Sequence, residues 1–170
     1  MKPQSSPLNI VDFAILNFEL NFIAPQANQD FDYQRDFKSY ELDIDFDINN
    51  DDFFQVFIKA DINRGESKAP GYSIFAEAAC IFQINDDKLN DEQKNSLKDF
   101  STIYIALNSL RGLISSFTAN APFGRYILPS IDLNDLINKK KASIKQSSQK
   151  KGATSKSPNK KVSTKKQAPK

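Results

Sequence analysis

The first half of the chain alternates between apolar and polar residues with a period of two, the pattern of half-buried β-strands. The segments AILNFELNFIA and YELDIDFDI carry it most clearly. In the first, alternation predicts one face made of Ala14, Leu16, Phe18, Leu20 and Phe22. In the second, it predicts an apolar face made of Tyr40, Leu42, Ile44, Phe46 and Ile48, opposite Glu41, Asp43, Asp45 and Asp47.

Two further strands follow. NNDD at 49–52 predicts a hairpin turn into FFQVFIKADI, and NRGESKAPG at 63–71 predicts a second turn into YSIFAEAACIFQI. Four strands joined by short links predict an antiparallel meander with one packed face and one wetter face. Cys80, inside the fourth strand, is expected to be a buried thiol without a redox or metal role.

After residue 90 the apolar period becomes helical. The spacing predicts a long helix over about 91–119, with Asn90 and Gln93 forming a capping box and Pro122 ending it. Its apolar stripe is expected to contain Leu97, Phe100, Tyr104, Leu107, Leu110, Ile114 and Phe117. Between the helices, GRYILP is expected to be extended. A short second helix is predicted over about 132–141, capped by Ser130 or Asp132.

The fold class is therefore α+β: a four-stranded antiparallel meander packed by one long and one short helix. We expect a flexible N-terminus (1–9), one domain (10–138) and a disordered basic tail (139–170), because the tail has too few apolar residues to fold. Residues 1–138 contain 11 Lys and Arg against all 21 Asp and Glu, a net charge of −10. Residues 139–170 contain 12 lysines and no acid.

Catalytic and metal-binding chemistry is poorly represented. There is no His and only one Cys, and no GxGxxG, GxxxxGK[ST] or GxSxG motif occurs. The acidic row resembles a calcium loop only superficially, since Ile48 and Phe54 stand where an EF-hand read from Asp43 needs Gly and Glu. We expect no enzymatic activity, metal or cofactor, and interpret the row as a solvated face or a docking surface for a basic partner.

Apolar residues exceed what a single small core can use. Those on the nominally polar sides of strands, or off the main helical stripe, are Ile15, Ile23, Phe53, Phe57, Phe75, Ile81, Ile103, Ile105 and Leu113. Such a surplus indicates a subunit interface, a groove for extended apolar peptide, or both.

At this point the chain resembles the SecB family of export chaperones over about residues 10–140. In ELNFIAP, Glu19 fits an acidic position of that family's first strand, and Phe22, Ala24 and Pro25 match. From Arg111, the helix–hinge–helix segment follows the family without a gap. Ile114, Phe123 and Leu128 fall on like residues, and Ile131, Leu133 and Leu136 on the apolar positions of the final helix.

The resemblance implies a homotetramer, built as a dimer of dimers, that binds unfolded or precursor proteins along apolar grooves without ATP. The residues that it assigns to client binding are Phe22, Leu42, Ile44, Phe123, Ile131, Leu133, Leu136 and Ile137.

It also assigns docking on a SecA-like translocase motor to an acidic surface, for which the candidates are Glu19, Glu41, Asp43, Asp45 and Asp47. Ile23 and Phe75 depart from the family, which has acidic residues at those positions. The departures place ordinary delivery to SecA in question.

The hypothesis from sequence is an ATP-independent holdase for protein export. The alternative is an interaction or tethering protein on a SecB-like scaffold, whose lysine tail binds nucleic acid or an anionic membrane surface. A SecB-like chaperone serving an antitoxin belongs to the same alternative. No signal peptide or 20-residue apolar span is visible, so we expect a soluble, cytoplasmic protein.

Overall fold

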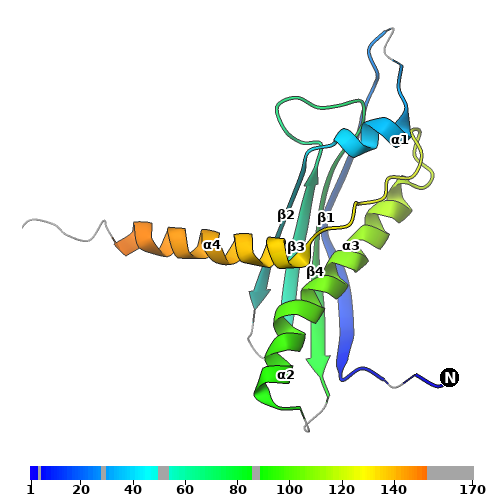
Figure 1. Cartoon of the computed structure of the whole chain (residues 1–170). Helices are drawn as coiled ribbons and strands as arrows, with labels where there is room; N and C mark the ends of the chain where they lie inside the picture. Colours follow the sequence, from blue (N-terminus) through cyan, green and yellow to red (C-terminus); the bar gives the residue numbers. More distant parts are fainter. Residues whose placement is uncertain (4, 28–29, 50–53, 86–88, 153–170) are drawn as a thin grey trace, which may run out of the picture.

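The protein is described by a computed structural model that covers residues 1–3, 5–27, 30–49, 54–85 and 89–152. One antiparallel sheet contains β1 (Leu8–Ile23), β2 (Leu42–Asn49), β3 (Phe54–Ile62) and β4 (Gly71–Ile84), in the order β1-β4-β3-β2. One face is covered by α2 (Asp91–Ser96), a π-helical segment (Leu97–Ser101) and α3 (Thr102–Thr118) (Figure 1). The short α1 (Tyr33–Asp36) and a 3₁₀ turn (Phe37–Ser39) lie at one end of the sheet, and α4 (Leu133–Gly152) follows α3. The predicted α+β class is confirmed.

The connection of the first strand differs from the prediction. β2, β3 and β4 are consecutive neighbours, but β1 pairs with β4 instead of β2. This pairing requires a long link between β1 and β2, which is the segment 24–41 that contains α1 (Figure 1). Of the predicted NNDD turn, Asn49 closes β2, and residues 50–52 lie outside the described part of the chain.

Two β-bulges change which side chains of β1 share a face. The register shifts between Ile10 and Asp12 and again between Ile15 and Asn17, which leaves one extra residue at each place. Ile15 is consequently opposite Ala78, on the same helix-covered face as Phe18 and Leu20. Ala14 is opposite Ala79, on the other face, so the prediction that Ala14 shares the face of Phe18 is wrong. Leu16 is the extra residue of the second bulge, where strict alternation breaks.

The core lies between this face and α3. Its fully buried strand residues are Val56, Ile58, Ala60 and Ile62 on β3, and Tyr72, Ile74, Ala76, Ala78, Cys80 and Phe82 on β4. The opposite face of the sheet carries Phe57, Phe75 and Ile81, which are half-buried. Phe53, from the predicted surplus, lies outside the described residues. Cys80 is buried as expected, and burial raises the pKa of its thiol to about 11.

The predicted long helix is confirmed, but its buried stripe is shifted. Asn90 accepts from the backbone of Gln93 and the Gln93 side chain accepts in return, forming the expected capping box. The residues of the helix that pack into the core are Ile103, Ala106, Leu107, Leu110 and Ile114, whereas Phe100, Tyr104 and Phe117 are exposed. The π-helical segment changes the helical phase before α3, so a constant 3.6-residue period misplaces Phe100. Tyr104 and Phe117 lie within α3, each next to the residue that is buried in its place, Ile103 and Thr118.

The second helix begins where predicted and is longer. Asp132 is the cap, because its Oδ1 accepts from the backbone N–H groups of Asn134 and Asp135. α4 continues to Gly152, past the expected end near 141, because its lysines, glutamines and alanine favour helix. The predicted boundary at 139 falls inside α4, residues 153–170 lie outside the described part, and the domain division stays a prediction. No helix among the described residues is long and apolar enough to cross a membrane.

Candidate functional site

The extended segment between α3 and α4, residues 123–132, is held by side chains from β4 and α3. The Tyr72 hydroxyl accepts from the backbone N–H of Phe123 (2.9 Å) and donates to the carbonyl of Gly124 (2.8 Å). The Thr118 Oγ1 accepts from the backbone N–H of Tyr126 (2.9 Å). The Arg111 guanidinium donates to two further carbonyls, those of Leu128 and Pro129, each at 3.0 Å. We call residues 123–132 the crossing segment, and the expectation that GRYILP is extended is confirmed.

Alternate residues of the crossing segment point to opposite sides. Tyr126 and Leu128 are buried in the core. Arg125, Ile127 and Pro129 are exposed, and Ile127 retains 63% of its accessible surface. The crossing segment therefore closes the core with one side and presents a wall to solvent with the other.

Aromatic rings gather beside this wall, where α1 and the 3₁₀ turn meet the sheet. The Phe37 ring lies 5.4 Å from each of the rings of Tyr40, Tyr72 and Tyr126. Tyr40 and Tyr126 stack with their centroids 5.6 Å apart. Phe31 and Phe123 extend the cluster, with 5.0 Å between their centroids. Rings at these separations attract one another beyond their area of contact.

The polar end of Tyr40 is fully engaged inside the protein. Its hydroxyl donates to the carbonyl of Pro70 (2.8 Å) and accepts from the backbone N–H of Tyr72 (2.7 Å). Gly71 allows this approach, because a Cβ there would lie 2.1 Å from the Tyr40 hydroxyl oxygen. Burial raises the pKa of Tyr40 to about 12.

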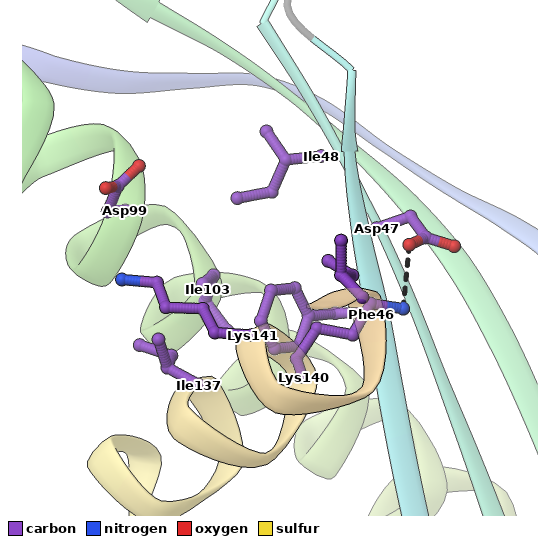
Figure 2. Close-up of a pocket in the computed structure, with 9 residues that line it drawn as sticks. Phe46, Asp47, Ile48, Asp99, Ile103, Ile137, Lys140 and Lys141 are labelled. Atoms are coloured by element: carbon purple, nitrogen blue, oxygen red, sulfur yellow. Dashed lines mark ion pairs between the residues drawn. The ribbon is translucent and has the colours of Figure 1, made fainter. Parts of the chain in front are cut away.

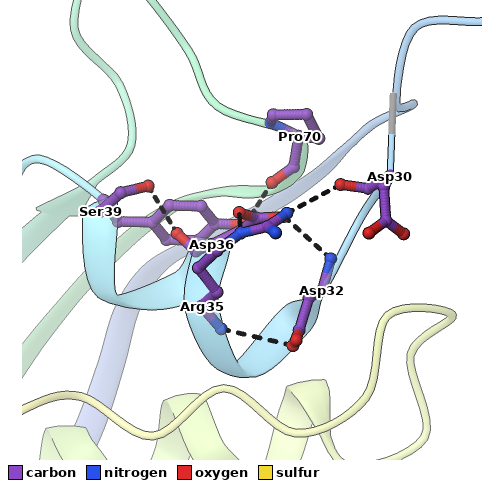
Figure 3. Close-up of polar contacts among 7 residues, drawn as sticks. Asp30, Asp32, Arg35, Asp36, Ser39 and Pro70 are labelled. Carbon is purple, nitrogen blue, oxygen red and sulfur yellow. Dashed lines mark hydrogen bonds and ion pairs between the residues drawn. The ribbon is translucent and has the colours of Figure 1, made fainter. Parts of the chain in front are cut away.

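The turn that carries Phe37 is fixed by a compact set of polar contacts (Figure 3). The Arg35 side chain donates to the Asp36 carboxylate (2.9 Å) and to the carbonyl of Asp30 (2.8 Å). The Ser39 hydroxyl donates to the carbonyl of Asp36 (2.7 Å). The hydrogen bond from Arg35 lowers the pKa of the Asp36 carboxyl, so the pair stays charged. These contacts hold the 3₁₀ turn, and with it Phe37, beside the crossing segment.

Between the turn and the crossing segment lies an open groove of about 440 Å³, within the range of small-ligand sites. We call it the aromatic groove. It is lined by Phe37, Lys38, Tyr40, Arg125, Tyr126, Ile127 and Pro129. Its floor is aromatic, one wall is apolar, and the two charged residues that line it are both cations.

A second groove, of about 240 Å³, lies where α4 passes β2 and the start of α3 (Figure 2). We call it the α4 groove. Its apolar lining is Phe46, Ile48, Ile103, Ile137 and Ile144, and its charged lining is Asp47, Asp99, Lys140 and Lys141.

Lys140 fastens α4 to the edge strand β2. Its Nζ lies 2.8 Å from an oxygen of Asp45 and 2.8 Å from an oxygen of Asp47, and 5.9 Å from the centre of the Phe46 ring. Partial burial acts to raise the pKa of Asp45, but the hydrogen bonds from Lys140 and the Phe46 backbone outweigh it, and the pKa is lowered. Partial burial likewise acts to lower the pKa of Lys140, and the two carboxylates reverse that effect and raise it.

The eight residues expected to bind clients fall into two groups. Phe22 and Phe123 flank Tyr72, with ring centroids 5.9 and 5.6 Å from it. The other six belong to β2, the end of the crossing segment and α4, and pack against the core: Leu42, Ile44, Ile131, Leu133, Leu136 and Ile137. Of the eight, Ile137 alone lines one of the two grooves described above. Their role in client binding stays a prediction.

Sequence reasoning missed the aromatic groove. Phe37 and Tyr126 were not singled out, and Tyr40 was taken as one member of a strand face. The available signal was local composition, since Phe31, Tyr33, Phe37 and Tyr40 stand within ten residues of the chain. Composition alone does not reveal that this segment meets the crossing segment almost ninety residues later.

Three of the five residues expected to dock a motor form ion pairs with cations of the same chain. Glu19 pairs with Arg64 at 2.7 Å, which lowers the pKa of its carboxyl. Arg64 also pairs with Asp61 (3.1 Å) and lies 5.1 Å from the centre of the Phe75 ring. Asp45 and Asp47 hold Lys140 as described above, whereas Glu41 and Asp43 are exposed. Motor docking stays a prediction.

No model of a protein family and no curated protein matches this sequence. Among solved structures, the fold is similar to the SecB-like chaperone Rv1957 of Mycobacterium tuberculosis, in complex with a ChAD peptide from the Rv1956 HigA1 antitoxin. The TM-score is 0.50 at 15% identity, over 74% of this chain and 91% of that chain. A protein of unknown function from Streptococcus agalactiae aligns with a TM-score of 0.34 at 10% identity, over 73% of this chain and 97% of that chain. The similarity to Rv1957 shows that the chain has a SecB-like fold.

Proposed function

We propose that this protein is an ATP-independent chaperone that holds extended apolar segments of unfolded polypeptides. The observation that carries the proposal is the aromatic groove, an open, mainly apolar surface that borders the hydrogen-bonded crossing segment. A client side chain that enters it loses contact with water, which is favourable without any chemical step. The α4 groove offers a second apolar site, and binding one chain at several weak sites raises the overall affinity.

The SecB-like fold supports this proposal, and the complex of the mycobacterial neighbour with an antitoxin peptide indicates one class of client. We include segments of antitoxins, with unfolded export precursors, among the proposed clients. For delivery to a SecA-like motor we propose at most a weak role, because Arg64 and Lys140 already occupy Glu19, Asp45 and Asp47. A cytoplasmic location belongs to the same proposal.

The test is suppression of aggregation of a chemically unfolded client, followed by light scattering in the absence of ATP. We expect the wild-type protein to suppress aggregation at near-stoichiometric ratios. Ile127→Gln, at an exposed wall of the aromatic groove, should weaken suppression. Phe100→Gln removes an exposed apolar side chain outside both grooves and serves as the matched control. Unchanged client aggregation with the wild-type protein would refute the holdase function.

A second candidate is tethering to a polyanion through the C-terminal lysines. α4 extends away from the sheet past β2 (Figure 1), and its described part exposes Lys139, Lys141 and Lys145. A chain truncated after Gly152 separates the two proposals. A holdase keeps client binding after truncation, whereas a tether loses salt-dependent retention on nucleic acid or anionic vesicles.

A further inference from the structure

The aromatic groove combines an uncharged floor with two cations at its border. Lys38 comes from the 3₁₀ turn and Arg125 from the crossing segment, the two elements between which the groove lies. Both side chains are exposed. Among the ion pairs between described residues, none involves either of them.

The nearest carboxylate on the same turn does not neutralise these cations. Asp36 is adjacent to Phe37, but Arg35 holds it through its Nε at 2.9 Å (Figure 3). The groove is therefore a local positive site on a domain whose net charge through residue 138 is −10. The general field of the domain attracts basic clients, whereas the groove itself attracts acidic ones at short range.

The lining of the groove also restricts which client side chain can lie between Lys38 and Arg125. The hydroxyl of Tyr40 is occupied by Pro70 and Tyr72, so Tyr40 contributes an apolar ring without an unpaired polar atom to the lining of the groove. Ile127 and Pro129 provide an apolar wall. An aromatic or large aliphatic client side chain fits this lining, because it buries apolar area and contacts ring faces without leaving a polar group unpaired.

We propose that the aromatic groove selects extended segments in which an aromatic or large aliphatic residue is flanked by Asp or Glu. The carboxylates pair with Lys38 and Arg125 while the apolar side chain lies on the floor formed by Tyr40 and Tyr126. This inference rests on the proposed function and specifies the class of client at one of its sites.

The experiment uses the full-length chain and three fluorescein-labelled peptides of about ten residues. They share an apolar aromatic centre and differ only in their flanks, which contain Glu, Gln or Lys. Affinities are measured by fluorescence anisotropy at low salt and at about 0.5 M salt. We expect the Glu-flanked peptide to bind roughly two- to fivefold more tightly per ion pair than the Gln-flanked one at low salt, and the difference to vanish at high salt.

The lysine tail also attracts acidic peptides, so variants must locate the preference. In Lys38→Gln/Arg125→Gln the tail is intact, so we expect the preference for Glu flanks to fall to the part that the tail contributes, while the Gln-flanked peptide binds as before. Lys94→Gln/Lys145→Gln removes the same charge far from the groove and should keep the preference. A preference that Lys38→Gln/Arg125→Gln leaves as large as in the wild type, or a preference for Lys flanks, would overturn the inference.

The outcomes separate the two proposals. Binding of all three peptides with equal affinity refutes the acidic preference and leaves the holdase function standing. Failure to bind any of the three, with client aggregation also unaffected, refutes the proposed function itself.

Discussion

At the scale of single residues, the geometry of the candidate site depends on one phenol. Tyr72 is buried on β4, and its hydroxyl accepts from the N–H of Phe123 and donates to the carbonyl of Gly124 in the crossing segment. Its ring also packs on Phe37 and Phe123. Tyr72 therefore links the sheet, the 3₁₀ turn and the crossing segment, the parts from which the aromatic groove is built.

We expect Tyr72→Phe to destabilise the protein by about 1–3 kcal/mol, because the N–H of Phe123 and the carbonyl of Gly124 lose their partner in a partly buried place. Urea unfolding followed by circular dichroism measures the change. Tyr104→Phe is the matched control, since the side chain of Tyr104 is exposed. Equal stability of Tyr72→Phe and wild type would contradict this account of the crossing segment.

The residue scale also marks where sequence reasoning stops. Phe123 was identified from its resemblance to a family position, and it does lie against Tyr72. The partners that make the groove, Phe37 and Tyr126, are distant in sequence and have no periodic signal to connect them. Their contact depends on the long link at 24–41, whose path across the sheet end follows from the pairing of β1 with β4.

At the scale of elements, α4 is attached to β2 by an ion-pair contact that the sequence pattern of α4 does not predict. The lysine run at 139–141 was interpreted as the start of a disordered tail, and in the structure Lys140 binds two carboxylates of β2. The alternation of β2 predicted an acidic face correctly, but not the cation that covers it. Periodicity likewise located β1 and the long helix, and failed where a bulge or a π-helical segment changes the period.

We expect Lys140→Gln to loosen α4 from β2. The pair is partly exposed, so the loss is about 1 kcal/mol, enough to lower hydrogen-exchange protection in the first turns of α4 several-fold. Lys139→Gln is the control, because Lys139 pairs with Asp135 of the same helix and its side chain is 75% exposed. Equal protection in the two variants would show that Lys140 does not hold α4.

The same contact gives α4 a defined pH dependence. The pKa of Asp45 is lower in the fold, so its pairing stabilises above the pKa of the unfolded carboxyl and is lost as the pH falls below about 4. The pKa of Lys140 is raised, so its contribution is complete below the ordinary lysine value and is lost well above pH 10. We expect α4 protection to be flat between these limits in the wild type and to fall on acidification, and Lys140→Gln should remove the acid step.

At the scale of the whole molecule, β1 is an edge strand that leaves several large apolar side chains exposed in a single chain. Its one neighbour among the described strands is β4. Its exposed large apolar side chains are Ile10, Val11, Ile15, Leu16 and Phe22. A long apolar edge strand has unpaired backbone groups along one side and tends to pair with another chain. We therefore expect β1 to lie in a homo-oligomeric interface, in agreement with the assembly that the SecB resemblance implies.

Light scattering and sedimentation of the full-length chain test this expectation. The wild type should form a dimer or tetramer at micromolar concentration, and Leu16→Lys should raise its dissociation constant by roughly tenfold or more, because a charge replaces an apolar side chain that the expected interface would bury. Asn17→Lys adds the same charge to the adjacent, already polar residue and should leave assembly nearly unchanged. Because the aromatic groove is built on elements other than β1, Leu16→Lys should still bind single peptides, while suppression of client aggregation falls as fewer sites act on one client. A monomeric wild type, or equal effects of the two substitutions, would contradict the expectation that β1 lies in a homo-oligomeric interface.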